Sequence, residues 1–300
     1  MRSIKIAILA MAVCMLCACG SGEGQTRGGA GAERATADDC LRSFLAQDSF
    51  TIEEDGTSKE YVDYEAAQKL FELYTAEGNS DMLQRFTRID DQLLKMEKTV
   101  PAGVETTYCH CDENGVLQKT YSDADLSVFF ACHYNEAGQL IEKSLYKSGE
   151  SEPEAVCTYK YDKNGSCTRY QDEDGRAYSF KYTYDDSGKV LTGPRVEFAP
   201  EGSLIMDTIR YTYEYDDGGR VVRMTGQQTN GKDISYEFTY DDQGRVLRVV
   251  NEMPEGTVTE DYSYENGRLT ERTVSLKGEV TVQKYTYGTR YIFDSEGLNL

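Results

Sequence analysis

The sequence predicts a mainly β protein. We expect a long antiparallel meander of hairpin repeats that forms a curved or partly closed sheet, with a short helical cap on its N-terminal side. A nine-residue phrase predicts the repeats, and it is clearest at residues 182–190 (YTYDDSGKV), 213–221 (YEYDDGGRV) and 238–246 (FTYDDQGRV). Aromatic and polar residues alternate before each Asp, which is typical of a half-buried antiparallel strand. Helical periodicity is confined to a stretch before these repeats.

Each copy of the phrase contains a tight turn between two strands. In Asp-x-x-Gly, Asp suits the first position of a type I turn, and Gly suits the fourth, where φ is often positive. A degenerate ninth copy is expected at residues 86–94, before the first clear one. The clear copies have their turn glycine at Gly115, Gly138, Gly165, Gly188, Gly219, Gly244, Gly267 and Gly297.

A second set of turn signals separates the copies, so each repeat is two strands and two turns. These signals lie at residues 101–103, 147–149, 174–175, 200–202, 230–231, 254–256 and 277–278. An aliphatic residue follows the turn glycine by two positions, as at Val190, Val221, Val246 and Leu269. Antiparallel pairing is expected to place it beside the preceding tyrosine. Because an aromatic face this long cannot remain in water, the sheet must curl, close, stack or be covered.

Residues 37–80 are expected to form the helical cap, and residues 81–300 the β-repeat domain. Apolar residues at helical spacing predict a helix over residues 62–77, and Gly78 and Asn79 form its stop signal. A shorter helix is expected near residues 38–46. We interpret both helices as a cap on the first repeat rather than as a partner-binding element, because terminal repeats need a cover.

Residues 1–18 are typical of a signal peptide, with Arg2 and Lys5 before an apolar run too short to span a bilayer. The run ends in LCACG, which resembles a bacterial lipobox. The resemblance implies cleavage before Cys19 and acylation of its sulfur; an ordinary cleaved signal or a free thiol is the alternative. Residues 19–36 are Gly-rich and read as a lipid-anchored tether. We therefore expect an exported protein, anchored to the cell membrane or the outer membrane and facing away from the cytoplasm.

The chain is strongly acidic, with a formal net charge of −20 at pH 7. This balance argues against nucleic acid as a partner, since nucleic-acid binding needs a basic surface. Beyond the signal, six cysteines remain, which permits three disulfides in an exported protein. Several occupy positions where other repeats carry Tyr, so small buried apolar side chains are the alternative. The six are Cys40, Cys109, Cys111, Cys132, Cys157 and Cys167.

The iterated phrase Tyr-x-Tyr-Asp-x-x-Gly-Arg-Val/Leu resembles the RHS or YD repeat family, over roughly residues 105–300. That family includes bacterial polymorphic toxins, wall-associated proteins, insecticidal toxin complexes and the extracellular part of teneurins. The resemblance implies a spiralling β-sheet that forms a shell or curved wall lined by the repeat tyrosines. The chain lacks the Asp-Pro-x-Gly junction of toxin members, the nearest match being residues 294–297, and we expect no enclosed effector.

No residue set predicts catalysis or a cofactor. His110 and His133 lie near Cys109, Cys111 and Cys132, but strand alternation separates them, so we expect no zinc site. The acidic turns lack calcium-loop spacing. The aromatic residues of the repeats have two possible roles. They are either buried core residues or residues of an open face that stacks on sugars. The candidate ligand-facing aromatics are Tyr182, Tyr184, Tyr213, Tyr215, Phe238, Tyr240, Tyr262 and Tyr264.

The expected function is that of a non-enzymatic surface lipoprotein, a binding or adhesion module for envelope glycan or a surface protein. The motivation is the lipobox, the tether, the repeats and the lack of a recognisable catalytic set. An accessory or immunity-like lipoprotein beside an RHS-type toxin is the alternative. A hydrolase hidden in the scaffold ranks last.

Overall fold

The computed structural model describes residues 36–45, 51–53, 58–61, 64–122, 125–147, 149–200 and 202–298. These residues form three helices and one 19-stranded antiparallel sheet. The prediction of a mainly β antiparallel meander that forms a curved or partly closed sheet is confirmed, and the sheet is curved without being closed. The expected signal peptide and Cys19, and all but the last residue of the tether, lie outside the described residues. Within the described ranges, none of the helices has the length and apolarity needed to span a bilayer.

The helices all precede the repeats, and the strands follow one another along the chain. The helices are α1 (Ala37–Leu45), α2 (Tyr64–Glu77) and α3 (Ser80–Leu83). The strands are β1 (Thr51–Glu53), β2 (Ser58–Tyr61), β3 (Phe86–Val100), β4 (Gly103–Cys111), β5 (Leu117–Ser122), β6 (Asp125–Tyr134), β7 (Leu140–Lys147), β8 (Ala155–Tyr161), β9 (Cys167–Gln171), β10 (Ala177–Ser179), β11 (Thr183–Tyr184), β12 (Val190–Phe198), β13 (Leu204–Tyr215), β14 (Val221–Gln227), β15 (Asp233–Tyr240), β16 (Val246–Met253), β17 (Gly256–Glu265), β18 (Arg268–Leu276) and β19 (Glu279–Asp294).

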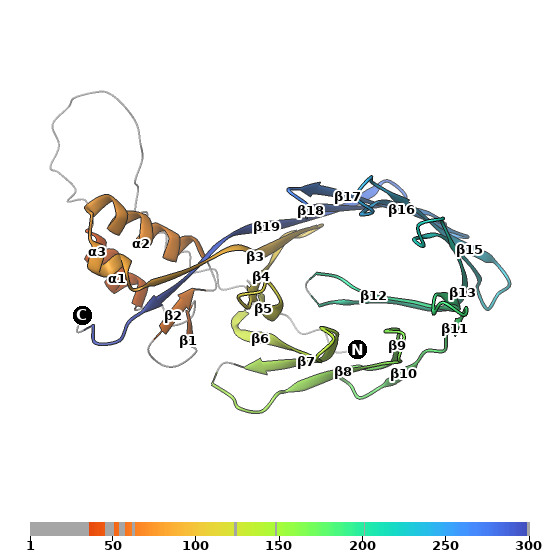
Figure 1. The fold of residues 1–300 in the computed structure, drawn as a ribbon, viewed down its shortest axis with the longest axis horizontal. Coiled ribbons are helices and arrows are strands. Elements are labelled where there is room, and N and C mark those ends of the chain that lie inside the picture. Colours follow the sequence, from red (N-terminus) through yellow and green to blue (C-terminus); the bar gives the residue numbers. More distant parts are fainter. Residues whose placement is uncertain are drawn as a thin grey trace, which may run out of the picture.

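The meander curls back on itself because its first and last long strands, β3 and β19, pair with each other. Strands β3 to β10 pair each with the next, as do β11 to β19. The last strand, β19, then pairs with β3 from Gln283↔Lys98 to Phe293↔Phe86. Among the described residues, β10 pairs with β9 and β11 pairs with β12, and no register joins β10 to β11, so the ladder stays open there. Figure 1 shows the resulting curve, with β7 and β8 on the wall opposite β16 to β18.

The turn chemistry follows the motif. Gly219 has φ +81°, and its N–H donates to the Asp216 carbonyl at 2.9 Å. The Asp216 carboxylate accepts from the backbone N–H of Arg220 at 2.8 Å. The expected cross-strand partners are present, as in Tyr215↔Val221. The same pairing recurs in Tyr184↔Val190, Tyr240↔Val246 and Tyr264↔Leu269.

One hairpin leaves the wall and enters the interior of the curve. The β12–β13 hairpin extends inward between the two walls (Figure 1). It departs at Gly193, where the register between β12 and β13 shifts and where a Cβ atom would lie 2.2 Å from the Tyr182 ring. Its tip reaches the opposite wall, since a Cβ atom on Gly202 would lie within 4 Å of the Cys132 and Leu117 side chains. The aromatic face is thus covered largely by the protein's own opposite wall and this hairpin.

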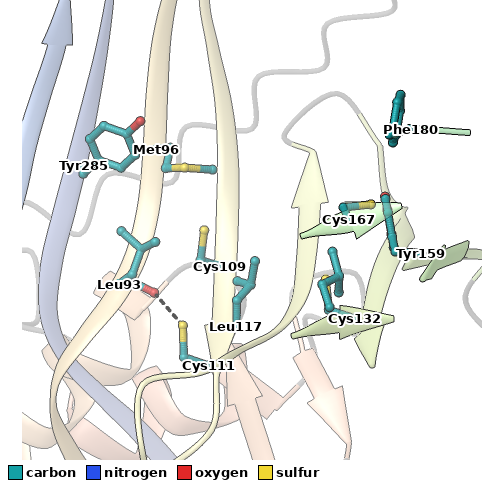
Figure 2. Packing of buried hydrophobic residues seen from close by; sticks show 11 residues of the cluster. Leu93, Met96, Cys109, Cys111, Leu117, Cys132, Tyr159, Cys167, Phe180 and Tyr285 are labelled. Carbon is teal, nitrogen blue, oxygen red and sulfur yellow. Dashed lines mark hydrogen bonds between the residues drawn. The ribbon is translucent and has the colours of Figure 1, made fainter. Parts of the chain in front are cut away.

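The largest core cluster contains buried residues from each of the strands β3 to β9 (Figure 2). Partly buried residues of the hairpin, such as Phe198 and Met206, pack against it. Inward-facing cysteines take the positions that tyrosines hold in other repeats, and Cys111 donates to the Leu93 carbonyl at 3.7 Å. Cys111, Cys132, Cys157 and Cys167 are free thiols, so the three-disulfide alternative is wrong. Cys111, Cys132 and Cys167 are buried, so the alternative interpretation, that they are small apolar core side chains, holds for these three. Cys109 is also buried in this cluster, and Cys40 packs against a separate cluster of the cap.

The N-terminal helices are present as predicted, and they cover the aromatic residues of the last copy of the phrase, where β19 pairs with β3. Leu70 and Tyr74 of α2 pack with Tyr291 and Phe293 of β19. The segment also contains β1 and β2, which the sequence pattern did not predict, and β2 pairs with β19. The prediction of a degenerate copy with its turn at residues 86–94 is wrong. This segment lies within β3, because no glycine is present there and β19 pairs along it.

Candidate functional site

In four repeats the second tyrosine of the phrase forms a hydrogen bond to an earlier repeat. Its hydroxyl donates to the backbone carbonyl two residues after the previous turn glycine. The distances are 2.7 Å for Tyr161 to Leu140, 2.7 Å for Tyr215 to Val190, 2.6 Å for Tyr240 to Val221 and 2.9 Å for Tyr264 to Val246. Tyr184 departs from this rule and donates to the Asp162 carboxylate. Burial raises the pKa of Tyr240 and Tyr264, which keeps these hydroxyls as donors.

The basic residue of the phrase completes this contact. The Arg220 guanidinium lies 5.0 Å from the centre of the Tyr240 ring, and Arg245 lies 4.6 Å from that of Tyr264. Arg220 also pairs with Asp216 of its own turn at 2.7 Å. Asp and Gly of the phrase therefore form the turn, while Arg and the second Tyr form the contact between repeats. These structural roles explain why the four residues recur, without a ligand.

Five of the eight candidate aromatics nevertheless meet around one cavity of about 350 Å³, which we call the aromatic cavity. They are Tyr213, Phe238, Tyr240, Tyr262 and Tyr264, and Phe198 of the inner hairpin faces the same space. The other three do not line it. Tyr182 packs over Gly193, while Tyr184 and Tyr215 are held by the bonds described above.

An ion network borders the same cavity through Arg195, Glu197 and Arg272. Arg195 of β12 pairs with Glu197 at 3.0 Å and lies 3.9 Å from Glu260 of β17. Arg272 of β18 pairs with Glu260 at 2.7 Å. Burial opposes the ionisation of Glu260, but the charge of Arg272 and hydrogen bonds from Tyr262 and Arg272 outweigh it and lower the pKa of Glu260. The network fixes the inner hairpin to the wall opposite its tip.

Sequence reasoning missed this network, although two signals were present. The spacing from Gly188 to Gly219 is the longest between clear copies, which leaves extra residues for an extended hairpin. Gly193 and Pro194 also interrupt a strand pattern, and such residues mark a bend or a close approach. Neither signal names the partners Glu260 and Arg272, because these lie far along the chain.

The histidines do not form a metal centre with the nearby cysteines. His110 is buried, and the Arg290 guanidinium lies 3.0 Å from its Nε2. Burial, together with the charges of Arg290 and Lys119, lowers the pKa of His110 to about 3. His133 is exposed. Over the part of the chain that the structure describes, no group of three or more His, Cys, Asp or Glu side chains is placed to hold a metal ion.

No protein-family model matches the chain, and no curated protein is significantly similar to it. Among solved structures, a TcdB2–TccC3 crystal structure without its hypervariable C-terminal region is 21% identical, with a TM-score of 0.23. That match covers 56% of this chain but only 10% of the toxin chain. Porin-like proteins from Bacteroides vulgatus and Bacteroides uniformis are 11% and 15% identical, with TM-scores of 0.35 and 0.29. The matches cover 66% and 65% of this chain and 99% and 96% of those chains. Similarity of this extent assigns neither a family nor a function.

Proposed function

We propose that this protein is an exported lipoprotein, anchored in a membrane through acylated Cys19, whose β-repeat scaffold is a non-enzymatic binding module for an envelope glycan. The lipobox-like LCACG and the Gly-rich tether support the anchor. The iterated YD phrase supports an RHS-like scaffold. The partners of the protein are then the lipid bilayer and a glycan of the cell envelope.

The observation that carries the glycan is the aromatic cavity. A sugar presents apolar C–H faces together with hydroxyls, so it fits a concave site with aromatic walls and a few polar groups. The cavity has both, since aromatic rings line it together with Arg195, Glu197 and Arg272. The Glu197 side chain is 45% exposed although it pairs with Arg195, so its carboxylate is accessible to a hydroxyl donor. A volume of about 350 Å³ suits one or two sugar units at the end of a glycan.

The test is to immobilise residues 20–300 and measure binding to an array of bacterial envelope glycans. Phe238→Leu should weaken the strongest signal about tenfold, because it removes one aromatic wall while keeping an apolar side chain. Phe129→Leu is the matched control, since Phe129 is a partly buried aromatic of a separate cluster outside the cavity. Binding that is absent, or that falls equally in both variants, would refute the glycan site.

A protein partner is the second candidate, as expected of an accessory lipoprotein beside an RHS-type toxin. The observation that favours it is the YD phrase itself, since the resemblance implies such systems. An envelope extract separates the two candidates. Capture that is lost after periodate oxidation of glycans supports the glycan, and capture that is lost only after protease treatment supports the accessory role.

A further inference from the structure

A second cavity, of about 500 Å³, lies at the tip of the inner hairpin, and we call it the tip cavity. Its lining includes Leu93, Cys111, Leu117, Tyr134, Arg268 and Tyr287. Pro200, in the turn of the hairpin, lines both the tip cavity and the aromatic cavity. On β18, Leu269 lines the aromatic cavity and Arg268 the tip cavity, and on β19, Tyr285 and Tyr287 divide in the same way. The two cavities are therefore adjacent and meet at the hairpin tip.

The YD phrase continues across the seam where β19 pairs with β3. Residues 285–287 (YTY) supply its two aromatic positions, and β19 continues past them instead of turning. Tyr287 pairs with Leu93 of β3, with the same register shift that Tyr264 shows in its pairing with Leu269. The Arg268 guanidinium lies 5.1 Å from the centre of the Tyr287 ring, as the basic residue does in other copies. Two strands from opposite ends of the repeat domain thus form one further copy.

The same repeat positions line both cavities as a result. The second aromatic of the phrase is Tyr240 and Tyr264 in the aromatic cavity and Tyr287 and Tyr134 in the tip cavity. The aliphatic residues of the matching position are Val221, Val246 and Leu269 in the aromatic cavity and Leu93 and Leu117 in the tip cavity. Cys111, which pairs with Leu117, takes the place of one tyrosine, and its smaller side chain leaves more space there. The cavities are two parts of one row of repeats.

The period of this row suits a polymer. Equivalent positions recur on every second strand, so they are roughly 9–10 Å apart across the sheet. In a β-1,4-linked glycan each sugar unit is turned over relative to the one before it, so the same face recurs at every second unit. Aromatic rings can stack on such a face, while the hydroxyls remain at its polar edge. A linear glycan therefore matches the row better than a single terminal sugar does.

The charge of the tip cavity narrows the class of glycan. Asp90, Asp91 and Glu113 contribute three negative charges and Arg268 one positive charge, which leaves a net of −2. Arg88 pairs with Asp90 at 3.3 Å, but this exposed pair offsets the charge only in part. Like charges oppose each other at an interface, so an acidic glycan is disfavoured. The ligand that fits is an uncharged one.

We propose that the aromatic cavity and the tip cavity form one groove, which binds an uncharged β-1,4-linked glycan along its length, with the glycan passing the inner hairpin at Pro200. This inference rests on the proposed function, because it extends the glycan site into the tip cavity. The two can fail separately. The glycan site alone predicts that a disaccharide binds as well as a longer chain, whereas the groove predicts a gain with length.

Calorimetric titration of residues 20–300 with cellobiose, cellotetraose and cellohexaose tests the groove. These probes are β-1,4-linked chains of two, four and six glucose units. Cellohexaose should bind at least thirtyfold more tightly than cellobiose, which exceeds the several-fold gain from offering more binding registers. The β-1,4-linked glucuronic acid hexamer, which has the same linkage and is acidic, should bind at least tenfold more weakly than cellohexaose.

The outcomes separate the groove from the glycan site. Affinity for cellohexaose within several-fold of that for cellobiose, or equal affinity for the acidic hexamer, would overturn the groove and leave the glycan site in place. Absence of binding at every length would also overturn the groove, and the glycan array then decides whether the site itself stands. The length series uses the unaltered sequence, so it is decisive even where a variant does not fold.

A variant of the tip cavity locates the gain. Tyr134→Leu should weaken cellohexaose about tenfold and leave cellobiose unchanged, because Tyr134 lines the tip cavity alone. Tyr161→Leu is the matched control, since Tyr161 is a partly buried tyrosine at the same repeat position outside both cavities. Phe238→Leu, in the aromatic cavity, should weaken both probes. A loss for cellohexaose no larger in Tyr134→Leu than in Tyr161→Leu would overturn the groove.

Discussion

The hydroxyl of Tyr240 donates to the backbone carbonyl of Val221 at 2.6 Å and so joins two successive repeats. Arg220, which follows the turn between them, covers the same ring at 5.0 Å. The tyrosine is therefore held by its hydroxyl and by its ring face at once. Because this contact recurs along the sheet, each repeat depends on its neighbour, as is expected of a repeat protein.

Tyr240→Phe should lower the free energy of unfolding by about 1 kcal/mol, because it removes one hydrogen bond and leaves the Val221 carbonyl without that donor. Urea unfolding followed by circular dichroism measures the change. Tyr146→Phe is the matched control, since Tyr146 is equally half-buried and contacts Phe129 through its ring. A loss no larger in Tyr240→Phe than in Tyr146→Phe would contradict the role given to the hydroxyl.

The wall of the sheet could be predicted from sequence because its rules are local. An Asp and a Gly three residues apart specify the turn, and alternation then fixes the Tyr–Val pairing. The inner hairpin could not be predicted, because its path depends on contacts between Arg195 and Glu260, which are 65 positions apart. The same limit explains β3, where pairing with β19 overrides the turn expected at residues 86–94.

Gly193→Ala should destabilise the protein by about 1–3 kcal/mol, because the new methyl would overlap the Tyr182 ring where the hairpin leaves the wall. The glycine is needed there for close approach. Tyr182→Leu in the same chain should recover part of the loss, so a double-mutant cycle should give a clear coupling energy. Additive effects of the two substitutions would show that the hairpin enters the interior without this contact.

Glu260→Gln should cost about 3 kcal/mol at pH 7, because it leaves the buried Arg195 and Arg272 without their shared carboxylate. The pKa of Glu260 is lowered from 4.5, so its stabilisation is present above that value and is lost as the pH falls through the folded-state pKa. The difference from wild type should therefore shrink as the pH falls below 4.5.

The matched control for this substitution is Glu237→Gln. Glu237 lies 4.0 Å from Arg223 and its side chain is 62% exposed, so the pair should contribute well under about 1 kcal/mol. A cost at pH 7 that is equal in the two variants would mean that the buried network does not hold the hairpin.

The candidate site, like the fold, has a part that could be predicted from local sequence and a part that could not. The eight aromatics could be named from their repeat position, but which five share a cavity depends on where the inner hairpin lies. Glu260 could not be named at all, because nothing in its neighbourhood in the sequence marks it as a buried carboxylate. Its burial depends on Arg195 of the inner hairpin and on Arg272 of the next strand.

His110 should make the protein less stable in mild acid. Its pKa is about 3 in the folded protein and about 6.5 when unfolded, so only the unfolded chain gains a proton between these values. Stability is therefore full above about pH 6.5 and falls below it, by up to about 1.4 kcal/mol per pH unit. Urea unfolding between pH 7.5 and 5 measures this slope before Glu260 titrates. His110→Gln should remove this component of the slope. The control is His133→Gln, at the exposed histidine, which should keep it. An unchanged slope in His110→Gln would show that the imidazole beside Arg290 does not stay neutral.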